Sequence, residues 1–80
     1  MNINEQIQDI IRGKISDAQV TVKNRGGGHF GLIVTTQEFA GKNTLAKHKL
    51  VLGAIAPLML GASAPVHAID SLETILPTTS

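Results

Sequence analysis

The chain has 80 residues, a formal net charge of +1 and no cysteine, and aromatic residues make up 2% of it. A chain of this length forms one domain and buries only about 60% of its unfolded surface. The absence of cysteine excludes disulfides, a thiolate nucleophile and a metal site held by the chain's own thiolates, and the scarcity of aromatic residues disfavours binding of single-stranded nucleic acid.

The first predicted element is a short amphipathic helix. Asn2 and Glu5 have the spacing of a capping pair, in which the asparagine side chain accepts from a backbone N–H and the glutamate reaches back. Isoleucines recur behind them at helical spacing, at Ile3, Ile7, Ile10 and Ile11. Gly13 is expected to end the helix.

Two strands are predicted next. Residues 18–24 alternate between apolar and polar side chains, as in a strand with one wet face. Residues 26–28 are three glycines that give a turn, and residues 29–36 (HFGLIVTT) predict a second, antiparallel strand. Its alternation places Phe30, Leu32 and Val34 toward the helices, and Gly31, Ile33 and Thr35 on the other face.

Asn43 is a good cap for a second helix that runs toward Met59, and Pro57 should end or kink this helix near Ala56. Its predicted apolar stripe consists of Leu45, Val51, Leu52, Ile55, Leu58 and Met59. Because His48 falls near the centre of the stripe, we expect it to face inward and to have a structural role.

A loop with Gly61 and Pro65 precedes a short third strand, predicted over residues 66–71. The sequence therefore predicts one small α/β (α+β) domain over residues 1–80, in the order α-β-β-α-β, with residues 1–2 and 77–80 as disordered tails. A right-handed crossover through the second helix makes the sheet mixed, with both helices on one face and the other face partly open.

One long apolar run, residues 50–69, follows a basic segment and imitates a signal peptide or a membrane span. About fifty patterned residues precede it, and prolines, glycines and His67 interrupt it. We therefore expect no membrane segment and a cytoplasmic location.

Four short motifs carry a family likeness: His29-Phe30, residues 39–42 (FAGK), residues 47–51 (KHKLV) and residues 66–69 (VHAI). In this order and spacing, over residues 7–77, the chain resembles the BolA family. The resemblance implies a fold related to the type II KH domain, a monothiol glutaredoxin as partner, and a [2Fe–2S] cluster shared with it. The partner's cysteine and glutathione would supply the remaining ligands.

The family's cluster-binding histidine falls on His67. Its second ligand, a cysteine or histidine in the hairpin loop, is replaced here by glycines, so that only His29 can substitute, as the weaker candidate. The usual acidic and aromatic C-terminal extension is shortened to residues 73–77. A zinc site made by the three histidines alone is disfavoured, because they lie on separate elements with no HxxxH spacing.

These observations predict a protein that is not an enzyme, because the carboxylates form no recognisable pair and no serine has a nucleophile setting. The predicted function is an adaptor in iron–sulfur cluster assembly or trafficking, or in iron regulation. The alternative is a DNA-binding regulator of stress or morphology genes, with phosphate contacts at Lys23, Arg25, Lys42, Lys47 and Lys49. A homodimer through the open sheet face and an exposed Leu50 is compatible with either function.

Overall fold

The computed structural model describes residues 2–61 and 63–77. The helices and strands are α1 (Ile3–Lys14), β1 (Gln19–Gly26), β2 (His29–Thr35), α2 (Thr44–Ile55) and β3 (Ala68–Ile75). Two short 3-10 turns, η1 (Gln37–Phe39) and η2 (Ala56–Met59), flank α2. The predicted α-β-β-α-β order is confirmed.

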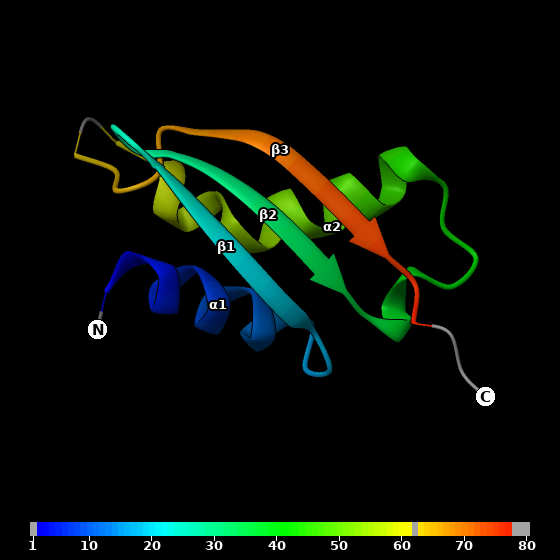
Figure 1. Cartoon of the computed structure of the whole chain (residues 1–80). Coiled ribbons are helices and arrows are strands. Elements are labelled where there is room, and N and C mark those ends of the chain that lie inside the picture. Colours follow the sequence, from blue (N-terminus) through cyan, green and yellow to red (C-terminus); the bar gives the residue numbers. More distant parts are fainter. Residues whose placement is uncertain (1, 62, 78–80) are drawn as a thin grey trace.

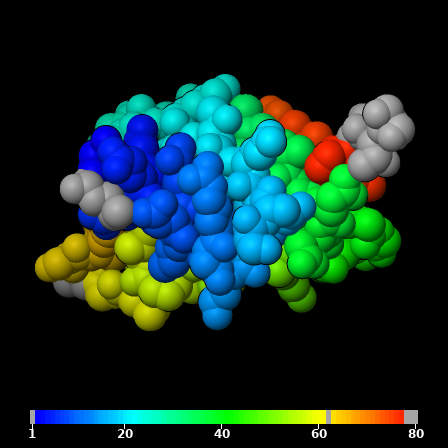
Figure 2. Space-filling view, turned by 90° about the horizontal axis from the view of Figure 1, so that it is seen from below, coloured from blue at the N-terminus to red at the C-terminus, as the bar shows by residue number. Residues whose placement is uncertain are grey.

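The three strands form one mixed sheet in the order β1-β2-β3. The central strand β2 is antiparallel to β1 and parallel to β3. Both helices lie on the same side of the sheet and leave its other face open, as predicted (Figure 1). Seen from below, α1 (blue) lies at the front, beneath the strands of the hairpin (cyan) (Figure 2).

The core lies between the sheet and the two helices and is almost entirely aliphatic. Each buried Ile, Leu or Val side chain contributes about 1.5–3 kcal/mol to folding. The side chains from β2 that face the helices are those predicted from alternation: Phe30, Leu32 and Val34. The helices contribute Ile7, Ile11, Val51, Ala54 and Ile55.

The first helix begins as predicted but ends later. The Asn2 side chain accepts a hydrogen bond from the Glu5 N–H at 2.9 Å. The prediction that Gly13 ends the helix is wrong, because α1 continues through Lys14 and the N–H of Ile15 donates to the Ile11 carbonyl at 2.8 Å. Ile15 is buried in the core, and the longer helix brings it there.

The second helix has the predicted ends but a narrower buried face. The Asn43 side chain accepts from the Ala46 N–H at 2.8 Å, and the α-helix stops at Ile55, two residues before Pro57. The prediction that Leu45 and Leu52 face the core is wrong, since these side chains are 63% and 38% exposed.

Contact with α1 and β3 selects the face of α2 that is covered, and this face is centred on Val51, Ala54 and Ile55. Leu50, expected to be exposed, packs against the core instead. His48 is half-buried, at the edge of the covered face.

The third strand is longer than predicted and begins later. It covers Ala68–Ile75 rather than residues 66–71, because Val66 is buried and its N–H donates to the Leu58 carbonyl at 3.2 Å, in the loop before the strand. A β-bulge lies within it. Phe30 pairs with Ile69 and Gly31 pairs with Ser71, so Asp70 is the extra residue. The bulge lets both Ile69 and Leu72 pack against the core.

The predicted tails fall mainly outside the described residues, which exclude 1 and 78–80. Asn2 is described and caps α1. In the described part of the chain, no helix has both the length and the hydropathy that a bilayer span requires.

Candidate functional site

The turn between β1 and β2 forms the base of the site. Gly26 pairs with His29, which leaves Gly27 and Gly28 as a two-residue loop with φ of 63° and 80°. Positive φ at both positions is the requirement of a type I′ hairpin turn, and glycine meets it without strain.

The segment that carries His67 is attached to this turn. The Gly28 carbonyl accepts hydrogen bonds from the N–H groups of His67 and Ala68, at 2.8 and 3.1 Å. The His67 ring lies directly against the turn, since a Cβ on Gly28 would lie only 2.9 Å from its Cγ. His67 is nevertheless an exposed residue.

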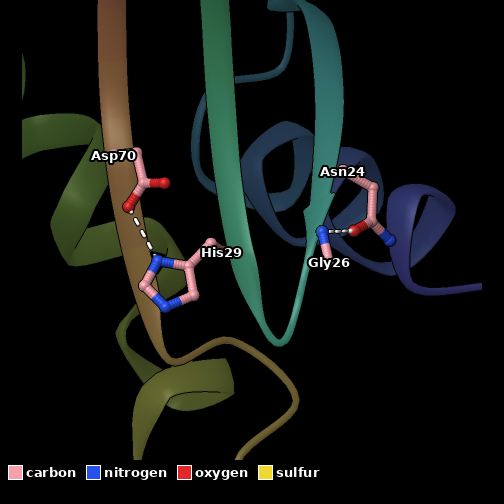
Figure 3. A network of polar contacts seen from close by, with 4 residues as sticks. All are labelled: Asn24, Gly26, His29 and Asp70. Carbon is pink, nitrogen blue, oxygen red and sulfur yellow. Dashed lines mark hydrogen bonds and ion pairs between the residues drawn. The ribbon is translucent and has the colours of Figure 1, made fainter.

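His29, at the start of β2, contacts the neighbouring strand β3. Its Nδ1 lies 2.9 Å from Oδ1 of Asp70, the bulged residue (Figure 3). The side chains are 50% and 42% exposed. On the β1 side of the turn, the Asn24 side chain accepts from the Gly26 N–H at 2.8 Å and so fixes the backbone where the chain enters the glycine loop.

The two predicted ligand histidines are therefore brought together at Gly28. His29 follows Gly28 in the chain, and His67 packs against it. Neutral imidazole nitrogen is a suitable ligand for iron and other transition metals. Both side chains are accessible, so the donor set fits a metal centre that a second protein approaches from outside. In the described residues, no group of three or more His, Asp or Glu side chains is arranged to hold a metal.

His48 takes no part in this site, since it lies in the middle of α2. The sequence analysis missed Asp70. The strand predicted over residues 66–71 stopped short of Leu72. A longer predicted strand would have included both Ile69 and Leu72, which are three apart and cannot share a face without a bulge.

The five cations of the DNA-binding alternative lie on two different layers. Lys23 and Arg25 belong to β1, and Lys23 pairs with Gly31 on the open face of the sheet. The Arg25 guanidinium lies over Gly31. A Cβ added to Gly31 would lie 3.4 Å from Nε of Arg25. Lys42, Lys47 and Lys49 instead lie just before α2 or within it, on the helix layer. DNA binding stays a prediction.

The carboxyl group of Asp17 has a shifted pKa, and it lies beside the end of β2 that is far from the hairpin turn. Asp17 accepts from the Thr36 hydroxyl, and its Oδ2 accepts from the Gln37 N–H at 2.9 Å. These hydrogen bonds to the charged form lower the pKa of Asp17 below its ordinary value. The contact connects the start of β1 to the end of β2 and has a structural role.

Comparison with known proteins identifies the fold and the family. The model of a family described as BolA-like protein matches residues 3–78. A Bol-like protein from Babesia bovis is 26% identical with a TM-score of 0.78, over 96% of this chain and 87% of that one. A BolA homologue from Coxiella burnetii is 28% identical with a TM-score of 0.77, over 96% and 94%.

BolA1 from Arabidopsis thaliana, at 16% identity, shares the fold with a TM-score of 0.78 over 100% of this chain and 98% of that one. No match was found among curated proteins.

Proposed function

The chain belongs to the BolA-like protein family, and from this premise we propose that it is a non-catalytic adaptor in iron–sulfur cluster assembly, trafficking or iron regulation. It binds a monothiol glutaredoxin, and the two proteins hold a [2Fe–2S] cluster between them. His67 is the principal ligand from this chain, and His29 is the second.

The observation that carries this proposal is that two accessible imidazoles both lie beside one hairpin turn. His67 packs against Gly28, and His29 follows Gly28 in the chain. A [2Fe–2S] cluster has four protein or small-molecule ligands. Two nitrogens from this chain leave two positions for the partner, which agrees with the cysteine and glutathione that the family resemblance implies.

Histidine ligation gives the cluster a higher reduction potential than four thiolates would, and it makes one side of the cluster sensitive to protonation. This chain's contribution is to present the two rings beside one turn, whose Gly28 carbonyl accepts from the His67 N–H. The absence of a side chain at Gly28 lets the His67 ring lie against the turn.

The test is to mix the protein with a monothiol glutaredoxin that carries its cluster and to record the visible absorption spectrum. We expect a new spectrum in a one-to-one complex. His67→Ala should abolish the new spectrum, and His48→Ala, a histidine replacement outside the turn, should leave it unchanged. An unchanged glutaredoxin spectrum on mixing, or equal effects of the two variants, would contradict the proposal.

A further inference from the structure

The contact between His29 and the β-bulge of β3 has a specific chemical consequence. We propose that Asp70 is a positioning residue, which holds the proton of the His29 imidazole on Nδ1 and leaves Nε2 as the nitrogen available to a metal. The choice of tautomer follows from the structure of this chain alone. The role of Nε2 as a ligand to the shared cluster rests on the proposed function.

The bulge is what makes this contact. Ile69 and Ser71 pair with consecutive residues of β2, and Asp70 is the additional residue between them. The extra residue disrupts the local pairing, and bulges commonly redirect a side chain in this way. The carboxylate of Asp70 reaches His29, at 2.9 Å from Nδ1.

Among the described residues, His29 is the one basic side chain within ion-pair distance of the Asp70 carboxylate. Arg25 also lies on the open sheet face, over Gly31. Within the described residues, the contact with His29 is the single close contact between a carboxylate and a basic side chain, and it is an ion pair only when the imidazole is protonated. Asp70 therefore acts on the imidazole rather than on the Arg25 guanidinium.

The direction of the hydrogen bond follows from the chemistry of the two groups. An ionised carboxylate can only accept, so Nδ1 must carry the hydrogen. A neutral imidazole has one N–H, and Nε2 then has a free lone pair. Histidines that bind metals commonly donate their other N–H to a carboxylate in this way, which orients the ring and increases its basicity.

Since the side chains of His29 and Asp70 are both about half exposed, their contact contributes little to folding stability. Variants of Asp70 should therefore fold.

The first experiment measures the tautomer of His29 in the free protein, by two-bond ¹H–¹⁵N correlation spectra at about pH 8.5, where free imidazole is neutral. We expect the Nδ1–H form in the parent protein and a shift toward the Nε2–H form in Asp70→Ala. Asp70→Asn should retain part of the Nδ1–H form, because its amide oxygen can still accept.

Glu73→Gln is the matched control, since it removes the same charge from β3 at a residue that pairs with Ile33 rather than contacting His29. It should leave the tautomer of His29 unchanged, and the signals of His48 provide a second control. An Nε2–H form of His29 in the parent protein, or identical spectra of the parent and Asp70→Ala, would overturn the inference.

The second experiment measures how fast the shared cluster is lost from the complex with glutaredoxin. Removing a carboxylate that orients a metal-bound histidine weakens metal binding about 10–100-fold. We expect Asp70→Ala to increase the rate of cluster loss by about tenfold, and Glu73→Gln to have no effect.

His29→Ala and His67→Ala separate the two proposals. If neither histidine variant alters the cluster, the adaptor function fails, whereas the tautomer measurement still decides the role of Asp70. If His29→Ala accelerates cluster loss and Asp70→Ala does not, the positioning role is overturned and the adaptor function stands.

Discussion

The imidazole of His67 lies against the α-carbon of Gly28, so closely that a methyl group cannot be placed between them. The contact joins the tip of the β1–β2 hairpin to the residue just before β3. The backbone reinforces it, since the Gly28 carbonyl accepts from the N–H of His67 at 2.8 Å. The orientation of the candidate ligand therefore depends on the absence of a side chain at residue 28.

Gly28→Ala should displace the His67 ring, whereas Gly27→Ala should not. Both glycines have positive φ, so alanine at either position costs about 1–2 kcal/mol of unfolding free energy. Only at Gly28 does the new Cβ overlap His67, since at Gly27 the nearest atom is 3.9 Å away. Urea unfolding should show similar or larger destabilisation for Gly28→Ala, and the ring signals of His67 should shift in that variant alone. Equal shifts of the His67 signals in both variants would contradict the packing.

Gly31→Ala tests the packing on the open sheet face. A Cβ on Gly31 would lie 2.7 Å from Oγ of Ser71, too close without a shift. In the parent protein we expect destabilisation of about 1 kcal/mol from overpacking. In a Ser71→Ala background the obstructing oxygen is gone, and the Arg25 guanidinium, 3.4 Å from the new Cβ, is the end of a flexible side chain that can move. The same Gly31→Ala change should then stabilise by about 0.4–1 kcal/mol, because alanine reduces the freedom of the unfolded chain.

A double-mutant cycle of urea unfolding measures this change of sign. A Gly31→Ala effect that is the same with and without Ser71 would show that the two residues do not interact.

The exposed and buried apolar residues of α2 should differ sharply in unfolding free energy. Leu45→Ala removes a side chain that is 63% exposed, and we expect an effect within about 0.5 kcal/mol. Ile55→Ala leaves a cavity in the core and should cost about 2–5 kcal/mol. Thermal or urea unfolding of the two variants checks this. Comparable losses of unfolding free energy would show that Leu45 packs in the core.

Local features of the sequence were sufficient to predict the order of the elements. Asn2 and Asn43 both accept the backbone hydrogen bonds of their own first turns, because a helix cap involves residues only three apart. The alternation along β2 also gave the correct buried face, since a strand without a bulge keeps period two.

The errors concern features that depend on distant parts of the chain. Helical periodicity places Leu45 on an apolar face, but the positions of α1 and β3 decide how much of that face is covered. The contact between His29 and Asp70 joins residues 41 apart and requires a bulge in β3. The candidate ligands themselves came from the family resemblance, whereas the residue that orients one of them appeared only in the structure.

The Asp17 carboxylate should make the stability of the protein depend on pH in the acidic range. Hydrogen bonds from the Thr36 hydroxyl and the Gln37 N–H lower its pKa in the folded state below the ordinary value of 3.8. A group with a lowered pKa stabilises the fold fully above its unfolded pKa, and this contribution is lost as the pH falls through the folded value. Asp17→Asn should therefore lower the urea midpoint at about pH 7, and the difference from the parent should shrink between about pH 4 and about pH 2.

Asp9→Asn is the matched control. It removes a charge from the exposed side of α1, where the described residues offer that carboxylate no hydrogen bond. A difference between the parent and Asp17→Asn that stays constant across this pH range would show that the carboxylate is not held by Thr36 and Gln37 in solution.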